Sequence, residues 1–367
     1  MLKTLLSRYF IATGFIVNLA VAVVGVMLAP GLVSRVFEAA ETVDPGTWEQ
    51  ARASIKTWSA HTNSGLGHAQ IRVDGREVPT LSDAADAMRD GSILEIGEGV
   101  YTEALIIRPD NTRVVGRGHV VFEKAAAKGK ATFIVEGSGT TIENIECRKV
   151  AVRDGNGACV RLEGKDLSLE HVYFHSSQQG LLTGSKPGHV RIRDSYFERL
   201  GNRGQAHGIY VGGGVLSIEQ SYILGAKSEG HEIKSRATHT TISRSVIASL
   251  NAKDSRLVDI SNGGIVKITD STLQQGPNSA NSDMIGFALE KRRHKENALV
   301  VHRNIIILER NGPNRLLHSR AKEMSPDISD NIIVTPKETA FKSTNLEYRR
   351  RAEAGLTAYP AVPMPLE

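Results

Sequence analysis

One short phrase recurs between residues 190 and 273, and it decides the fold. The phrase reads Val-Arg-Ile-Arg-Asp-Ser-Tyr-Phe at 190–197, Leu-Ser-Ile-Glu-Gln-Ser-Tyr-Ile at 216–223, Thr-Thr-Ile-Ser-Arg-Ser-Val-Ile at 240–247 and Val-Lys-Ile-Thr-Asp-Ser-Thr-Leu at 266–273. Its central apolar residue is Ile192, Ile218, Ile242 or Ile268, so the successive steps are 26, 24 and 26 residues. Periods of this size are typical of stacked structural repeats.

The same phrase extends in both directions along the chain. Equivalent anchor residues are Ile142, Leu169, Val301 and Ile328. Three positions after the anchor, from the third repeat onward, a small polar residue is expected at a corner, and an apolar residue two positions later points inward. The small polar residues are Ser195, Ser221, Ser245, Ser271, Asn304 and Asn331. Each phrase therefore predicts a short strand, a bend and a second strand, with too few residues between copies for a crossover helix beside every strand.

A single coil of this kind cannot bury its apolar face, but stacked coils share one continuous core. Over roughly residues 92–335 the sequence resembles the right-handed parallel β-helices of the pectate-lyase-like superfamily. We therefore expect an all-β chain, a single-stranded right-handed parallel β-helix of about ten coils. The resemblance implies a carbohydrate-active protein and allows a Ca²⁺ cofactor. The sequence itself requires no cofactor, and we assign no residue as a metal ligand.

The N-terminal residues 1–31 predict a membrane anchor. Residues 10–29 are apolar and uncharged, which matches the thickness of a bilayer when they are helical. Lys3 and Arg8 precede this run and favour a cytoplasmic N-terminus. A cleaved signal peptide is the alternative. Either interpretation places the β-helix outside the cytoplasm, in the periplasm of a Gram-negative cell.

Four further segments follow. Residues 32–77 are expected to be a partly helical spacer and 78–91 a capping helix with Thr80 or Ser82 as N-cap. Residues 92–336 form the predicted β-helix, and 337–367 a C-terminal cap and tail. For Cys147 and Cys159, buried free thiols are favoured over a disulfide, which an oxidising compartment would also allow. The net charge of +5 permits an anionic partner, and we expect no nucleic acid as a partner.

A second recurrence lies eight to ten residues before each anchor and supplies the candidate site. Tyr210, Lys234 and Asp259 are expected at the same strand position of adjacent coils. Strand alternation then turns Tyr210, Glu232, Lys234, Arg236 and Asp259 outward as one patch, because neighbouring rungs are about 4.8 Å apart. Our candidate catalytic residues are His207, Tyr210, His231, Glu232, Lys234, Arg236 and Asp259, and our candidate substrate-binding residues are Asn262 and Glu290.

Removal of a proton α to a carboxylate needs a base, a cation for the enolate and an acid. Lys234 or His231 is the expected base, Arg236 the cation, and Tyr210 or His207 the acid. This set resembles the lyases and epimerases of the superfamily that use basic residues, and it predicts a lyase or C5-epimerase acting on a uronate-containing polysaccharide. One alternative is a non-catalytic, membrane-tethered scaffold that binds or exports polysaccharide.

A glycoside hydrolase is a further alternative, with two carboxylates flanking the scissile bond. Glu232 with Asp259, or Asp259 with Glu290, would supply that pair. The structural alternative to every one of these functions is a ladder of surface ion pairs without chemistry.

Overall fold

The computed structural model describes residues 44, 46–62, 65–290, 294–341 and 344–365. Within these ranges, no helix is both long enough and apolar enough to cross a membrane. The anchor predicted at residues 10–29 lies outside the described residues, as do residues 32–43, 45 and 63–64 of the predicted spacer.

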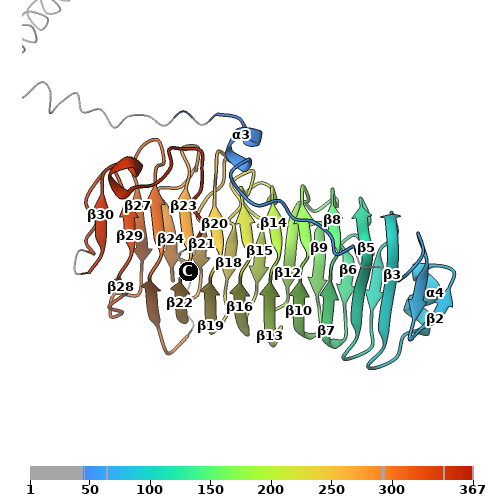
Figure 1. Cartoon of the computed structure of the whole chain (residues 1–367). Helices are drawn as coiled ribbons and strands as arrows, with labels where there is room; N and C mark the ends of the chain where they lie inside the picture. The colour runs from blue at the N-terminus through green and yellow to red at the C-terminus, as the bar shows by residue number, and fades with distance from the viewer. Residues whose placement is uncertain (1–43, 45, 63–64, 291–293, 342–343, 366–367) are drawn as a thin grey trace, which may run out of the picture. The chain divides into compact units, whose positions relative to one another are not determined.

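The described chain is a parallel β-helix whose coils stack three faces of strands (Figure 1). The first face is a nine-stranded sheet of β4 (Leu105–Ile107), β6 (Ala131–Val135), β9 (Ala158–Leu162), β12 (Gln179–Thr183), β15 (Ile209–Val211), β18 (Ile233–Ser235), β21 (Val258–Ile260), β24 (Asp283–Phe287) and β27 (Arg315–Ser319). The second face comprises β7 (Ser138–Glu143), β10 (Lys165–Glu170), β13 (His189–Arg193), β16 (Val215–Glu219), β19 (His239–Ser243), β22 (Ile265–Thr269), β25 (Ala298–His302) and β28 (Asp327–Ser329). The third comprises β8 (Glu146–Arg148), β11 (Tyr173–His175), β14 (Tyr196–Glu198), β17 (Tyr222–Leu224), β20 (Val246–Ala248), β23 (Thr272–Gln275), β26 (Ile305–Leu308), β29 (Ile332–Val334) and β30 (Leu346–Tyr348). In the first coils, β3 (Ile93–Tyr101) and β5 (Arg113–Glu123) are long strands that run through both the second and third faces.

The anchors found in the sequence are partners in the sheet. Ile192 pairs with Ile218, Ile218 with Ile242, and Ile242 with Ile268. All four are at most 1 % exposed, and the inward residues of the third face, such as Phe197, are buried with them. The repeat period and the continuous core predicted from the sequence are confirmed. Nine strands on the first face, rather than about ten coils, set the length of the stack.

The corner between the second and third faces is held by a ladder of small polar residues. The backbone N–H of Ser195 donates to the Oγ of Ser221 at 3.2 Å, and that of Ser221 donates to the Oγ of Ser245 at 3.1 Å. The same pattern continues through Ser271, Asn304, Asn331 and Asn345. The residue before each corner has a positive φ, for example Asp194 at 47°. Each side chain therefore satisfies a buried backbone donor of the neighbouring coil.

A short helix closes the first coil. The helix α4 (Leu81–Ala87) follows an antiparallel hairpin of β1 (Ile71–Val73) and β2 (Arg76–Val78). Thr80 is its N-cap and accepts a hydrogen bond from the N–H of Asp83 at 3.0 Å. Leu81, Ala84 and Met88 join the main core. The cap therefore covers the apolar end of the stack, which would otherwise be exposed.

Part of the segment expected as a spacer packs on the third face instead. The helix α3 (Trp48–Arg52) and the residues after it run along this face (Figure 1). Trp58 is 8 % exposed and its Nε1 donates to the carbonyl of His171, and Arg52 pairs with Glu198 at 2.9 Å. The C-terminal tail lies on the same surface, after the 3₁₀ helix η1 (Arg351–Ala354). In this tail, Val362 is buried, and its backbone N–H donates to Ser54 Oγ.

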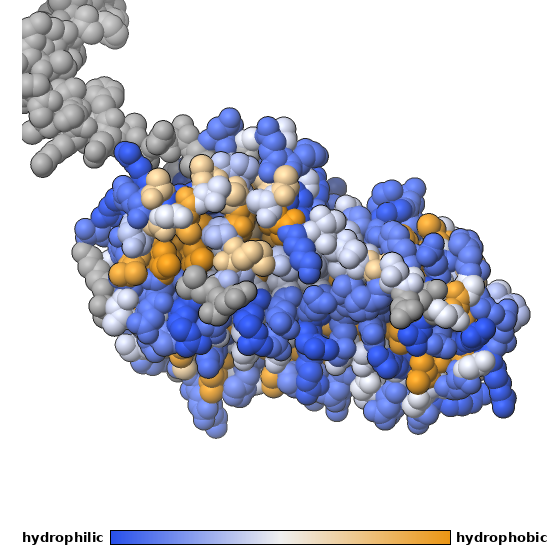
Figure 2. Space-filling view, viewed as in Figure 1, coloured by the Kyte–Doolittle hydropathy of each residue, from blue (hydrophilic) through white to orange (hydrophobic). Residues whose placement is uncertain are grey.

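The surface seen in Figure 2 is largely hydrophilic, with hydrophobic residues gathered below α3 at the end of the stack that carries the C-terminus. Tyr196, Tyr222 and Leu224 themselves are buried, because α3 and the C-terminal tail pack against them.

Cys147 and Cys159 form a disulfide with a Cα separation of 5.8 Å. The favoured expectation of two free thiols is therefore wrong. Cys147 lies on β8 and Cys159 on β9, the next strand around the coil, and both side chains point into the interior. Sequence spacing alone does not show that the coil brings them together.

We expect the Cys147→Ala, Cys159→Ala double variant to lose about 2–3 kcal/mol of unfolding free energy, because the 12-residue separation closes a loop in the unfolded chain. Urea unfolding of the oxidised protein and the variant measures this difference. A reducing agent should destabilise the natural protein and leave the variant unaffected. Equal stability of the two oxidised proteins would contradict the prediction.

Candidate functional site

A column of polar side chains crosses the first face. Tyr210 on β15 pairs in register with Lys234 on β18, and Lys234 with Asp259 on β21. The column continues to Gly286 on β24 and His318 on β27. The predicted alignment of Tyr210, Lys234 and Asp259 is confirmed. Their predicted exposure to solvent is wrong for two of them, because Lys234 is 9 % and Asp259 3 % exposed.

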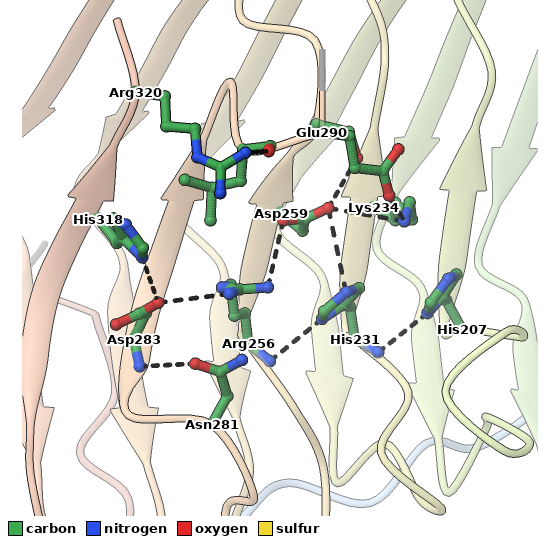
Figure 3. A network of polar contacts seen from close by, with 12 residues as sticks. His207, His231, Lys234, Arg256, Asp259, Asn281, Asp283, Glu290, His318 and Arg320 are labelled. Carbon is green, nitrogen blue, oxygen red and sulfur yellow. Dashed lines mark hydrogen bonds and ion pairs between the residues drawn. The ribbon is translucent and has the colours of Figure 1, made fainter. Parts of the chain in front are cut away.

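A second column lies three residues before the first on each coil. It consists of His207, His231, Arg256, Asp283 and Arg315. The backbone N–H of His231 donates to Nδ1 of His207, and that of Arg256 donates to Nδ1 of His231, both at 3.1 Å (Figure 3). Sequence reasoning missed Arg256 and Asp283. Their constant offset of three residues from the first column was the signal that could have found them.

The two histidines of the second column are neutral donors. His207 and His231 are 1 % and 7 % exposed, and their rings stack at 4.8 Å. Burial, reinforced by nearby positive charge, lowers the pKa of His207 to about 2 and that of His231 to about 3. Because each Nδ1 accepts a backbone N–H, the proton of each neutral ring lies on Nε2. Neither ring therefore offers a free basic nitrogen, which removes His231 as the expected base and His207 as a strong acid.

Asp259 is a buried carboxyl group surrounded by donors. It is 3 % exposed, and its Oδ2 accepts a hydrogen bond from Ser261 at 2.6 Å. Lys234 Nζ lies 3.7 Å and His231 Nε2 4.0 Å from the same oxygen. Arg256 lies 3.6 Å from Oδ1. The charge of Asp259 is thus compensated from several sides, as a buried carboxylate requires.

Arg256 bridges two carboxylates because Gly286 leaves room for it. Its guanidinium lies 3.6 Å from Asp259 and 3.3 Å from Asp283. A Cβ at Gly286 would meet Arg256 Cδ at 2.8 Å and Asp259 Oδ1 at 2.9 Å. Burial alone would raise the pKa of Asp283, but hydrogen bonds from His318 and Arg256 hold it below its usual value.

Glu290 lies across the two cations of the first face. Its Oε1 accepts from Lys234 Nζ and its Oε2 from Arg236, each at 2.5 Å. Arg236 also donates to the phenol oxygen of Tyr210. Burial would raise the pKa of Glu290, but the hydrogen bonds from Lys234 and Arg236 outweigh it and lower the pKa to about 2. Lys234 and Arg236 thus form a carboxylate seat beside Tyr210, and Glu290 fills it.

Tyr210 lies beside the same cations. Lys234 Nζ is 5.8 Å and Arg236 Cζ 5.2 Å from the centre of its ring. Glu290 itself belongs to the connection 288–297 between β24 and β25, which is longer than the connection 261–264 between β21 and β22. The side chain of Glu290 is 43 % exposed, so an external carboxylate can compete with it for the seat.

Glu232 does not belong to this patch, and its predicted outward orientation is wrong. It is fully buried and accepts a hydrogen bond from the N–H of Ala226 at 3.0 Å. The residue precedes β18 in a bend, where strand alternation no longer holds. Glu232 therefore cannot form the carboxylate pair with Asp259 that we expected for a glycoside hydrolase. Asn262, the other candidate for substrate binding, lies in the turn after β21 and is 6 % exposed.

The residues of this face do not fit a calcium ion. Within the described residues, no group of three or more His, Cys, Asp or Glu side chains is arranged to hold a metal. Asp259 and Glu290 are paired with lysine and arginine instead. Hard cations need several oxygen ligands, and we derive no step through a metal.

The fold is that of a parallel β-helix. No known family model matches the chain, and no curated protein matches it in sequence. Among solved structures, it is similar to "Structure of PL6 family alginate lyase AlyGC", with 12 % sequence identity and a TM-score of 0.38. The similarity covers 76 % of this chain and 41 % of that one, so the chain spans about two fifths of that protein's length.

Proposed function

We propose that the first face binds an acidic polysaccharide and acts as a lyase or C5-epimerase on its uronate residues. The observation that carries this proposal is the seat formed by Lys234 and Arg236. The chain's own Glu290 shows that the seat accepts a carboxylate through two charge-assisted hydrogen bonds. A uronate carboxylate presents the same group, and it would bring the adjacent C5–H toward Tyr210.

The proposed chemistry follows from the two positive charges that a carboxylate in this seat would contact. Loss of the C5 proton moves negative charge onto the carboxylate oxygens, and two fixed cations stabilise that charge more strongly in the transition state than in the ground state. In elimination, the C4–O bond then breaks, a C4=C5 double bond forms, and the acid protonates the leaving oxygen. In epimerisation, a proton returns to C5 from the opposite side of the ring.

Tyr210 and Lys234 are the residues that we assign to proton transfer. Arg236 donates to the phenol oxygen of Tyr210 and stabilises the charge that this oxygen carries after losing its proton. Tyr210 is therefore the favoured base. Lys234 Nζ pairs with Glu290 at 2.5 Å and lies 3.7 Å from Asp259 Oδ2, and we favour Lys234 as the acid. These roles are the reverse of those expected from the sequence.

We also propose that the protein works outside the cytoplasm. The disulfide between Cys147 and Cys159 supports this location, because such bonds persist in oxidising compartments.

The deciding experiment incubates the full chain with alginate, pectate and other uronate polymers. New ultraviolet absorbance would report unsaturated ends, and proton NMR would report inverted residues. Either result supports the proposal. New reducing ends without ultraviolet absorbance would show hydrolysis instead, and binding without any change of the polymer would show a scaffold. Hydrolysis, binding without any change of the polymer, or an absence of binding would each overturn the proposed chemistry.

Removing the internal competitor should tighten binding. We expect Glu290→Gln to lower the Kd for a uronate oligomer about tenfold, because the seat no longer has to release a charged carboxylate. Calorimetric titration measures this change. Glu296→Gln is the matched control, since Glu296 is exposed and near in sequence. Weaker binding in Glu290→Gln would show that Glu290 contacts the ligand rather than competing with it.

A further inference from the structure

The basic-Ser-Arg order of the carboxylate seat recurs three strands further along the first face. Lys234, Ser235 and Arg236 correspond in register to His318, Ser319 and Arg320, through β21 and β24. Backbone bonds carry this correspondence to the last position: Ser261 N–H donates to Ser235, Ala288 to Ile260, and Arg320 to Phe287. Three rungs separate the two sets by about 14 Å.

The second set differs from the first in what lies over it. His318 uses Nδ1 to bond Asp283 at 2.8 Å. Arg320 is exposed, and its NH1 donates to the carbonyl of Leu289 at 2.7 Å. Among the described residues, no carboxylate pairs with Arg320, whereas Glu290 pairs with Arg236. The guanidinium therefore keeps donors for an external acceptor.

On the two rungs between these sets, the corresponding residues are either buried or small. Asp259 and Ser261 bond each other and are buried. On the next rung, the corresponding residues are Gly286 and Ala288, which carry the smallest side chains. Arg256 fills the space beside Gly286, so a ligand that crosses these rungs passes over Arg256 rather than over bare backbone.

We propose that Arg320, with His318 beside it, is a second carboxylate seat, and that the ligand is a uronate polymer lying across the strands along the axis of the helix. One uronate carboxylate occupies Lys234 and Arg236, and another, further along the same polymer, binds Arg320. This inference rests on the proposed function, because it extends the same site. It predicts that the protein distinguishes long uronate oligomers from short ones.

A size series of uronate oligomers, from dimer upward, tests the second seat by calorimetric titration of the full chain. Affinity of the natural protein should rise once the oligomer spans both seats. Arg320→Ala should leave binding of the dimer unchanged and weaken binding of the long oligomers about tenfold or more, since it removes a charge-assisted hydrogen bond to the second carboxylate. Arg320→Lys should restore part of the gain, and Arg320→Glu should remove it.

Arg191→Ala is the matched control, because Arg191 is an exposed strand arginine on the second face. Melting temperatures should show that every variant is folded. An unchanged gain with length in both Arg320→Ala and Arg320→Glu would overturn the second seat while leaving the proposed function intact. Failure of the natural protein to bind any uronate oligomer would instead overturn the proposed function and the second seat together.

Discussion

Lys234→Met is expected to reduce turnover of the uronate polymer by at least about 10³-fold, because the variant loses both the proposed acid and one cation of the carboxylate seat. Methionine is apolar and of similar length, so it fills the same space without charge. Asp259 keeps Arg256 and Ser261 as partners, which limits the loss of stability. The initial rate of ultraviolet absorbance increase measures the effect.

Lys267→Met is the matched control, since Lys267 is an exposed strand lysine on the second face. It should retain full activity. A second arm separates chemistry from binding: the Lys234→Met variant should bind the oligomer more weakly than the natural protein and show a much larger loss of kcat than of affinity. Near-normal turnover by Lys234→Met would remove Lys234 from the catalytic residues.

Glu232→Gln is expected to weaken the pH dependence of stability, because Glu232 and Asp254 are two fully buried carboxyl groups close together. Asp254 is held by Ser249 at 2.7 Å and Ser279 at 2.5 Å. Burial raises the pKa of Asp254 to about 7, and burial together with Asp254 raises the pKa of Glu232. A raised pKa means that the folded state holds protons that the unfolded state has released.

The buried carboxyl pair therefore lowers stability as pH rises from about 4, where unfolded carboxyl groups ionise, through about 7. Below about pH 6.5 the buried neutral His207 and His231 oppose this fall, because their lowered pKa values make stability rise with pH. The slope is at most about 1.4 kcal/mol per pH unit for each proton involved. Urea unfolding between about pH 6.5 and 8, where the unfolded histidines are already neutral, should show this fall in the natural protein and a shallower one in Glu232→Gln. Glu229→Gln, which alters an exposed ion pair with Lys253, should keep the natural slope. Equal slopes in all three proteins would show that the buried pair does not control the dependence.

The fold could be predicted because its determinants are local and repeated. Ile192, Ile218, Ile242 and Ile268 recur at the coil period, and the pairing of these residues in the sheet follows from that recurrence. Alternation within a strand likewise predicted the column of Tyr210, Lys234 and Asp259, but it also predicted exposure to solvent, whereas Lys234 and Asp259 are buried.

The other predictions that were wrong or missed depend on features beyond the alternation within one strand. Glu232 precedes β18, and its orientation is set by the bend rather than by alternation. Arg256 acts through Asp259 and Asp283 on neighbouring coils, and Gly286 provides its space, so its role depends on the register of three strands at once. The bond between Cys147 and Cys159 depends on a Cα separation that is set by the path of the coil.

The ladder of serine and asparagine corners has a consequence for how this protein can change. Because each corner is fixed to the next coil, added residues must be accommodated elsewhere around the coil, as in the connection 288–297 that carries Glu290. Insertions or deletions in that connection would change which carboxylate competes for Lys234 and Arg236, while the buried core of the coils stays unchanged. Selection can thus change the ligand preference through this surface connection while the stacked coils beneath it keep their structure.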